Sequence, residues 1–397
     1  MRFPIITAAL ILAANTALAA GGERRVYVQC GGNFSSFVNK MKAVAERQGF
    51  SPAVTQPFFA AADFSKRTIN ADRRQGIFKT DFISFSRKLI SQNRINRGRS
   101  NSQKYNSIFT AIERQLGVPR GMLLSFWAFE TDYGAVQGDF NTLDSLMTLS
   151  HDCRRPGLFQ PQVFAALELF SRGDFPTNVQ GAWAGEIGMV QMLPKDILER
   201  GLDGDGDGKV NLKTSVADAL FSGANMLRGF GWRPNEPWMQ EVVVPQNLPW
   251  EDTGFHTSKP VGDWARLGVR PRSGAFEGPG LRASILLPMG RKGPAFLAYP
   301  NYQALFEWNQ SFVYVATAAY FATRLSGAPV YDAGNADKPL SDGQMKALQK
   351  KLAARGYNVG KIDGILGAGT RAAVQAEQKR LGLPADAWPT RELLNRL

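Results

Sequence analysis

One apolar segment that ends in an acid constrains this chain more than any other feature. Residues 120–130 read RGMLLSFWAFE, and Pro119 just before them is well placed as the first residue of a helix. The segment predicts an apolar helix that ends before Gly134. Its last residue, Glu130, is a carboxylic acid among aromatic side chains, and loss of water around a carboxyl group raises its pKa. Glu130 is a candidate general acid, although an exposed helix end or a structural ion pair would also account for it.

The composition limits the chemistry that can accompany this acid. The chain has 397 residues but only two cysteines and two histidines, which disfavours zinc sites and iron–sulfur clusters. With 44% hydrophobic and 20% charged residues, it is expected to fold as one large core or as two to three domains. The formal net charge of +13 indicates an anionic partner, which is nucleic acid, a membrane surface or an acidic wall polymer.

The start of the chain is typical of a secretory signal peptide. Residues 1–20 combine an early positive charge at Arg2, an apolar run over 5–14 and the small residues around Leu18. The run is shorter than the roughly 20 residues that span a bilayer, and no cysteine lies near the cleavage point. No later stretch approaches transmembrane length. We therefore expect a soluble periplasmic protein without a transmembrane or lipid anchor.

Export changes what is expected of the cysteines and of the positive charge. In an oxidising compartment, Cys30 and Cys153 are expected to form a disulfide, and two buried free thiols are the alternative. Nucleic acid is disfavoured, because the positive charge is dispersed and the chain shows no helix-turn-helix, RNA-binding signature or basic arm.

The remaining chain divides into three parts. Residues 21–327 carry helical patterning, interrupted over 254–300 by a Pro- and Gly-rich stretch with short apolar runs. Residues 328–339 are a Gly-, Ala- and Asp-rich linker, and 340–397 form a small module with its own apolar core. That core would consist of Leu348, Leu352, Val374, Leu381, Leu383 and Leu393. Helices are expected at 162–171, 215–228 and 311–325, and strands at 283–287 and 295–298.

Two segments have compositions suited to a sugar ligand. Residues 181–194 (GAWAGEIGMVQMLP) let a ligand approach the backbone, and Gln191 offers an amide for sugar hydroxyls, although tight helix packing also uses small residues. At 308–311 (WNQS), an aromatic ring stands beside amides at the opening of the late helix, with Tyr314 one turn on. A helix cap and a core aromatic are the alternative there.

A third segment is acidic and repetitive. Residues 203–211 read DGDGDGKVN, which matches the first half of an EF-hand calcium loop. Three carboxylates spaced two residues apart would repel one another without a cation. The twelfth position is Thr214 instead of Glu, so that Asp218 would have to close a variant site. An exposed acidic turn is the alternative.

Taken together and in this order, these segments resemble the lytic murein transglycosylase B family. The resemblance covers roughly residues 28–326 and is carried by FWAFETDYG, LSHDCRRPGLF, GAWAGEIGMVQMLP, DGDGDGKVNL, GANMLRGFGW and EWNQSFVY. It implies a mainly α fold: a lysozyme-like catalytic domain with a small β subdomain and an EF-hand-like calcium loop. The implied activity is cleavage of peptidoglycan glycan strands, which would be the partner of this protein.

The tail resembles a second family, the three-helix peptidoglycan-binding domain, through 356–367 (GYNVGKIDGILG) and Thr370. It departs from that pattern at Glu377, where Phe is usual, and at Ala387, where Gly often follows the Asp. The resemblance implies an intact three-helix fold with a wall affinity weaker than is typical.

The first resemblance implies a mechanism with one acid and no cofactor, an exception to the usual pair of glycosidase carboxylates. Glu130 would protonate the glycosidic oxygen while the N-acetyl group of N-acetylmuramic acid stabilises the anomeric carbon. The same carboxylate would then deprotonate the C6 hydroxyl, which attacks C1 and leaves a 1,6-anhydro end without water. Calcium would be structural only.

By position, the resemblance assigns roles to further residues. The saccharide contacts would be Gln191, Asn309, Trp308, Tyr314, Arg154 and Arg155. The calcium ligands would be Asp203, Asp205, Asp207, the carbonyl of Lys209, and Asp218. The chain departs from the family at Glu186, Ala182, Met226 and Phe85. An extra carboxylate at Glu186 would raise the pKa of Glu130 further or repel anionic wall peptides.

Two other functions are compatible with the sequence. A hydrolytic muramidase on the same scaffold would release reducing ends through water. A wall-binding scaffold protein without activity would fit the departures and the tail, although the retained Glu130 and Gln191 argue against it.

Overall fold

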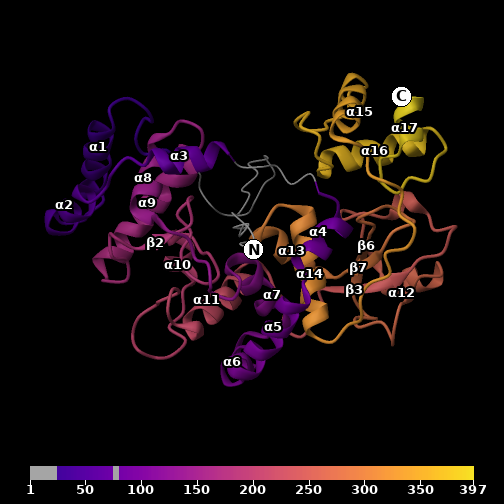
Figure 1. The fold of residues 1–397 in the computed structure, drawn as a ribbon, viewed down its shortest axis with the longest axis horizontal. Coiled ribbons are helices and arrows are strands. Elements are labelled where there is room, and N and C mark those ends of the chain that lie inside the picture. The colour runs from indigo at the N-terminus through magenta and orange to yellow at the C-terminus, as the bar shows by residue number, and fades with distance from the viewer. Residues whose placement is uncertain (1–24, 75–79) are drawn as a thin grey trace. The chain divides into compact units, whose positions relative to one another are not determined.

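The computed structural model describes residues 25–74 and 80–397, and the predicted signal peptide, residues 1–20, lies outside the described residues. Contacts along the chain group the described residues into two compact units (Figure 1). The first unit comprises residues 25–74 and 101–229, and the second comprises 80–100 and 230–397. The second unit thus contains both the Pro- and Gly-rich part and the C-terminal module.

The first unit is helical apart from one short two-stranded sheet. Its helix α7 (Arg120–Thr131) is buried at every residue but the first, and it packs against α6 (Asn106–Leu116) and α11 (Val216–Gly229). The strands β1 (Phe140–Asn141) and β2 (Gln180–Gly181) pair antiparallel. The other helices are α1 (Phe34–Arg47), α2 (Pro52–Ala60), α3 (Lys66–Arg73), α8 (Thr142–His151), α9 (Pro156–Ser171) and α10 (Pro194–Arg200).

The predicted helices of this unit are present, with two differences. Pro119 is the N-cap of α7, with an extended ψ of 142°, instead of its first helical residue. Helix α9 begins at Pro156, before the predicted start at residue 162, and it runs through Pro161. Proline suits a first turn because the N–H that it lacks would have no partner there. The sequence predicts only the part of α9 that follows Pro161, because an interior proline usually ends a helix.

The second unit is built on a five-stranded antiparallel sheet with the strand order β4-β6-β7-β3-β5. The strands β6 (Arg282–Leu286) and β7 (Ala295–Ala298) confirm the two predicted strands, and Ile285 pairs with Leu297 in their centre. Helix α14 (Phe312–Leu325) confirms the predicted late helix. The other elements are β3 (Met239–Val243), β4 (Lys259–Pro260), β5 (Arg270–Pro271), α4 (Phe82–Leu89), α5 (Gln92–Lys104), η1 (Trp250–Asp252), α12 (Val261–Arg266) and α13 (Pro300–Trp308).

The C-terminal module has three helices, α15 (Asp342–Ala354), α16 (Ala368–Arg380) and α17 (Arg391–Arg396). All six predicted core residues belong to its apolar cluster: Leu348, Leu352, Val374 and Leu393 are buried, and Leu381 and Leu383 pack against them. The predicted domain boundaries stay a prediction, since contacts group this module with the sheet. Within the described part of the chain, none of the helices has the length and apolar composition needed to cross a membrane.

Candidate active site

Glu130 lies near the end of α7 and is almost completely buried, with 4% of its surface exposed. The helix ends one residue later in a turn of Asp132, Tyr133 and Gly134, whose φ angles are 51°, 59° and 81°. Left-handed φ is uncommon for residues with a side chain, and such strain concentrates at functional sites. The Thr131 hydroxyl fixes the turn by accepting the Gly134 N–H at 2.9 Å. The acid is thus held between a buried helix and a hydrogen-bonded turn.

The Gly- and Ala-rich segment 181–194 packs directly on this turn. The Thr131 hydroxyl donates to the Met189 carbonyl at 2.6 Å, and the Met189 N–H donates to the Leu212 carbonyl at 2.8 Å. A Cβ on Gly188 would lie 2.5 Å from the Leu212 carbonyl oxygen, so only glycine fits there. Close packing therefore explains at least this small residue, although the contact joins two turns and is not the tight helix packing of the alternative interpretation.

Gln191 belongs to the same segment. It is buried, with 9% exposed, and its backbone is left-handed with a φ of 55°. Its side-chain nitrogen donates to the Gly188 carbonyl at 2.8 Å, which holds the amide in one orientation. Its contact with a sugar stays a prediction.

Glu186 is buried in this segment, with 2% exposed, and neither of its carboxyl oxygens has a hydrogen-bond partner among the described residues. Burial raises the pKa of Glu186 to about 7, and the nearby positive charge of Arg155 already offsets part of that increase. A carboxyl group with this pKa is partly protonated near neutral pH. This property follows from the departure noted in the sequence, and its influence on Glu130 stays a prediction.

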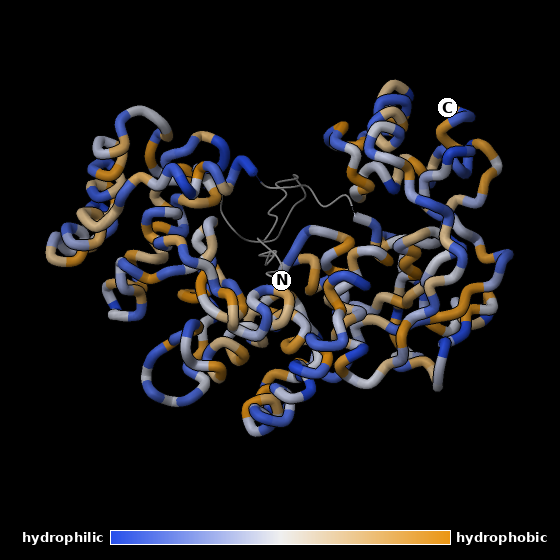
Figure 2. Tube along the Cα trace, viewed as in Figure 1, coloured by the Kyte–Doolittle hydropathy of each residue, from blue (hydrophilic) through white to orange (hydrophobic). Residues whose placement is uncertain are grey.

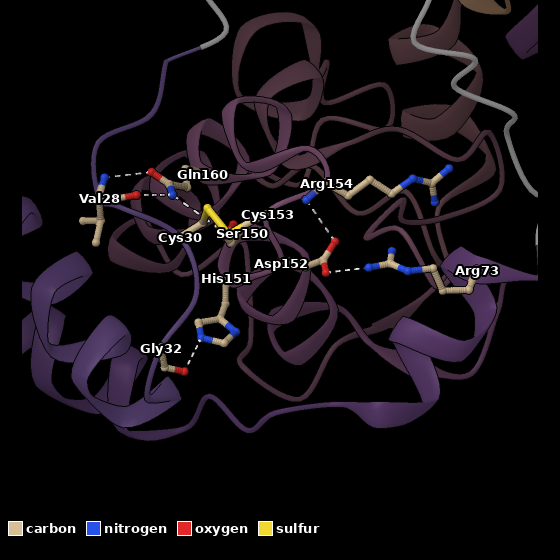
Figure 3. The surroundings of a disulfide bond; sticks show 10 residues. All are labelled: Val28, Cys30, Gly32, Arg73, Ser150, His151, Asp152, Cys153, Arg154 and Gln160. Atoms are coloured by element: carbon tan, nitrogen blue, oxygen red, sulfur yellow. Dashed lines mark hydrogen bonds and ion pairs between the residues drawn. A yellow bond between two sulfur atoms is a disulfide. The ribbon is translucent and has the colours of Figure 1, made fainter. Parts of the chain in front are cut away.

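The two arginines predicted to contact substrate bind a buried aspartate. Arg154 Nη1 lies 2.6 Å from one oxygen of Asp72, whose side chain is 1% exposed, and Arg155 pairs with the other oxygen. Arg73 pairs with the same carboxylate. It also pairs with Asp152 at 2.6 Å, the contact drawn in Figure 3. Three guanidinium groups thus compensate one buried charge. Asp72 has no local signal in the sequence, because Arg154 and Arg155 lie 82 and 83 residues away along the chain.

Cys30 and Cys153 form the predicted disulfide, whose surroundings are drawn in Figure 3. The bond joins residues that are 123 positions apart. The Gly31 N–H donates to the His151 carbonyl at 2.9 Å, and a His151 ring nitrogen lies 3.0 Å from the Gly32 carbonyl oxygen. The start of the described chain is thereby fixed to the end of α8, next to the arginine cluster.

Two predicted calcium ligands, Asp203 and Asp205, lie in the loop between α10 and α11, which is hydrophilic along most of its length (Figure 2), and a third, Asp218, lies in the first turn of α11. Carboxylate oxygens of Asp203, Asp205 and Asp218 lie within 4.8 Å of one another. Asp203 accepts the Gly208 N–H at 2.8 Å, and Asp218 accepts the Asn211 N–H at 2.7 Å. Such backbone bonds lower the pKa of Asp203. Several ionised oxygens in one loop are the donor set that calcium prefers.

Asp207 lies outside this convergent group. It is exposed, and its carboxylate accepts the N–H of Lys209 at 2.9 Å. The roles of Asp207 and of the Lys209 carbonyl as ligands stay predictions.

The other predicted saccharide contacts belong to the second unit. Trp308 is the last residue of α13, Asn309 leaves the helix with an extended backbone, and Ser311 is the N-cap of α14. The prediction that this segment opens one late helix was therefore wrong in part: residues 308–311 are an elbow between two helices, which we call the α13–α14 elbow. The Asn309 side-chain oxygen accepts the Ser311 N–H at 2.8 Å. Trp308, Asn309 and Tyr314 are all buried.

The structure also describes the environment of the other residues that differ from the two family patterns. Ala182, Met226 and Phe85 are buried. In the module, Glu377 is also buried, and it pairs with Arg380 at 2.7 Å and with Arg355 at 3.7 Å, so that two arginines compensate its charge. Ala387 has a φ of 60°, which explains why glycine is often found at that position.

Comparisons with known proteins identify a family for each of the two parts of the chain. The family described as transglycosylase SLT domain matches residues 33–323, and the family described as peptidoglycan binding domain matches residues 341–397. Membrane-bound lytic murein transglycosylase B of Escherichia coli (strain K12) is 27% identical over 235 residues, which is 58% of this chain. The alignment spans 63% of the length of that relative.

Solved structures add detail to the family match. SltB3 from Pseudomonas aeruginosa, in complex with NAG-anhNAM-pentapeptide, is 32% identical with a TM-score of 0.84, over 92% of this chain and 99% of that chain. The Escherichia coli lytic transglycosylase Slt35, in complex with calcium, shares the fold at 24% identity and a TM-score of 0.62, over 75% of this chain and 96% of that chain. Because the family matches most of its length, this protein belongs to the transglycosylase SLT domain family of enzymes, with a mainly α, lysozyme-like fold and a C-terminal peptidoglycan-binding domain.

Proposed function

We propose that this protein is an exported, periplasmic lytic transglycosylase that cleaves the bond between N-acetylmuramic acid and N-acetylglucosamine in peptidoglycan. The observation that carries the proposal is Glu130, a buried carboxyl group at the end of α7 in a chain of this family. The solved complex of SltB3 with NAG-anhNAM-pentapeptide supports a product with a 1,6-anhydro end. The disulfide between the two cysteines of the chain supports an oxidising compartment.

Glu130 acts twice in the proposed reaction. As a carboxylic acid it transfers its proton to the glycosidic oxygen, the bond from that oxygen to C1 breaks, and the N-acetyl group of N-acetylmuramic acid stabilises C1. As a carboxylate it then accepts the proton of the C6 hydroxyl, whose oxygen forms the new bond to C1. The carboxyl group ends the cycle protonated again, and no water is consumed.

Further residues of both units are proposed to bind the glycan strand. Gln191 and Asn309 would read sugar hydroxyl and N-acetyl groups, and Trp308 and Tyr314 would stack on sugar rings. Arg154 and Arg155 would meet the anionic parts of the wall, while Asp72 sets their orientation.

Structural calcium and wall attachment complete the proposal. Asp203, Asp205 and Asp218 would hold a calcium ion, assisted by Asp207 and the carbonyl of Lys209, and the ion would stabilise the acidic loop without taking part in the chemistry. The C-terminal module would hold the enzyme on peptidoglycan strands.

The test is digestion of purified sacculi with the wild-type chain and with Glu130→Gln. We expect the wild type to release fragments whose ends are lighter by one water than reducing ends. Glu130→Gln should be slower by about a thousandfold, because it can neither donate nor accept the proton. Glu199→Gln, which loses an exposed acid of α10, is the matched control and should cut at the wild-type rate.

Each other function has its own outcome. Products with ordinary reducing ends would identify a hydrolytic muramidase. A wild type that binds sacculi without releasing fragments would identify a binding scaffold. Cleavage by Glu130→Gln at the wild-type rate would remove the catalytic assignment, provided that both proteins show the same melting temperature.

A further inference from the structure

The C-terminal module is docked onto the rest of the second unit by side chains of its own. Gln375 of α16 donates to the carbonyls of Trp250 and Thr253, at 3.2 Å and 3.0 Å. The Arg291 N–H donates to the carboxylate of Asp386 at 2.9 Å. The module therefore contacts the catalytic part directly and is not tethered by the linker alone.

Arg371 lies one turn before Gln375 on α16, and it reaches the α13–α14 elbow. Its guanidinium carbon is 4.6 Å from the ring centre of Phe312, the residue that starts α14. Its Nη2 donates to the Pro288 carbonyl at 3.2 Å. Phe312 follows the elbow directly, so a residue of the wall-binding module touches the structure that presents Trp308 to the sugar in the proposed function.

The surroundings of Arg371 compensate its charge poorly. Its Nε is buried without a hydrogen-bond partner, and no carboxylate of the described residues lies within ion-pair distance of it. Burial lowers the pKa of Arg371 to about 10. The charge of Asp386, which lies beyond ion-pair distance, and the aromatic faces of Phe312 and, at 5.9 Å, of Trp388 stabilise the cation. A cation kept in such a place at a cost in solvation is a candidate for a specific role.

Phe312 also packs against aromatic residues of the catalytic part. Phe312 packs against Phe306 of α13, with ring centres 6.4 Å apart, and Phe306 packs against Phe255 at 4.6 Å. Both helices that flank the elbow therefore meet at the ring that Arg371 covers. A shift of Phe312 would change the angle at which the chain passes from α13 to α14.

We propose that Arg371 of the peptidoglycan-binding module is a positioning residue for the α13–α14 elbow, and through it for glycan binding by the catalytic domain. This inference rests on the proposed function, since that function assigns Trp308 and Asn309 to the sugar. The guanidinium group holds Phe312 at the start of α14, and Phe312 in turn sets the direction in which the elbow leaves α13. The module then contributes to substrate affinity at the catalytic domain in addition to its own affinity for the wall.

The test compares three variants of the full-length chain on a soluble, peptide-free glycan tetrasaccharide. Arg371→Met should raise KM about tenfold with kcat nearly unchanged, because the cation–π contact stabilises the bound geometry of the elbow. Arg371→Lys keeps a cation near Phe312 and should recover most of the affinity. Gln375→Ala is the matched control: it removes a docking contact of the same helix face but does not touch the elbow, so its KM should equal that of the wild type.

Hydrogen–deuterium exchange supplies a readout that does not need activity. The backbone amides of residues 306–316 should exchange faster in Arg371→Met than in the wild type and in Gln375→Ala. A wild-type KM together with unchanged exchange in Arg371→Met would overturn the inference. An equal change in Gln375→Ala would also overturn it, because docking as a whole would then set the elbow. If the wild type does not cleave glycan, the proposed function fails, while exchange still decides whether Arg371 holds the elbow.

Discussion

The two compact units of this protein are stabilised by different means. The first contains the Cys30–Cys153 disulfide, the buried Asp72 with its three arginines, and the acidic loop around Asp203. The second has no cysteine, and apolar packing in the sheet and in the C-terminal module stabilises it together with ion pairs such as that of the buried Glu377 with Arg380. The covalent restraint and the acidic loop therefore both lie in the unit that contains Glu130.

These restraints reach the turn that follows the proposed catalytic acid. Asp218 of the acidic loop accepts the N–H of Asn211, the next residue Leu212 bonds Met189, and Met189 bonds Thr131. Transition-state stabilisation depends on groups that are already held in place before the reaction. The first unit achieves this with groups that are oxidised, charged or able to bind a cation. The two units should therefore respond differently to reductant, to pH and to chelator.

Reduction of the disulfide should have the largest effect and should be confined to the first unit. A cross-link between residues 123 positions apart restricts the unfolded chain, and its loss should cost about 4–5 kcal/mol. Hydrogen–deuterium exchange of the full-length protein with and without dithiothreitol measures this loss separately for peptides from 101–229 and from 230–397. The Cys30→Ser/Cys153→Ser double variant should match the reduced wild type. An equal loss of protection in both units would contradict the comparison.

Asp72→Asn should come next, with a loss of about 3–4 kcal/mol. The substitution removes the carboxylate charge that three arginines share, and one of them, Arg155, is itself only 10% exposed. Urea unfolding measures the change. The control is Asp139→Asn, which breaks the exposed pair with Arg67 and should cost less than about 0.5 kcal/mol. Similar losses in the two variants would show that burial of Asp72 is unimportant.

Replacing a buried glutamate with glutamine should have opposite effects on stability in the two units. The folded-state pKa of Glu186 is raised from 4.5 to about 7, so the folded state binds this proton more tightly than the unfolded state. Its contribution to stability is greatest below pH 4.5 and falls as pH rises toward 7. Glu186→Gln should remove this loss and be more stable than the wild type by about 2–3 kcal/mol at pH 8.

Glu377→Gln is the matched variant of the second unit. It breaks the pair with Arg380 and should destabilise the protein at pH 8. Urea unfolding of both variants between pH 4.5 and 8 checks these signs. A Glu186→Gln variant that keeps the pH dependence of the wild type would mean that another group titrates.

Calcium should stabilise the first unit by a smaller amount. A ligand at about ten times its Kd adds about 1.4 kcal/mol to the folded state. The melting temperature of the chelator-treated protein should rise when calcium is added, and Asp205→Asn should abolish the rise because Asp205 belongs to the convergent group. Asp139→Asn, which is distant in the sequence from the acidic loop, should keep it. An unchanged melting temperature in the wild type would remove the calcium site.

Local patterns predicted most of this fold. The apolar run before Glu130, the β7 strand and the six core residues of the module each follow from residues close together in sequence. The disulfide followed from a count of two cysteines and the expected compartment. The α13–α14 elbow has no proline or glycine to mark it in the sequence, and residues 309–311, with extended backbone at Asn309 and Ser311, separate the two helices.

Long-range electrostatics explains what the sequence did not predict. Asp72 stands in an ordinary polar segment, and its importance comes from arginines 82 and 83 residues away. Arg371 likewise has no distinguishing neighbours in α16, and its contact with Phe312 exists only because the module docks. Partners of this kind are chosen by the tertiary fold, so a single sequence holds no pattern that marks them.

The smallest predicted effect tests backbone strain in the second unit. Ala387 has a φ of 60°, where a Cβ costs about 1–2 kcal/mol and glycine costs nothing, although glycine also makes the unfolded chain more flexible. Ala387→Gly should therefore stabilise the module by about 0.5–1 kcal/mol in urea unfolding. Ala372→Gly, at an exposed position inside α16, is the control and should destabilise it by about 1 kcal/mol. If both variants lost stability, the left-handed turn after Asp386 would not be a source of strain.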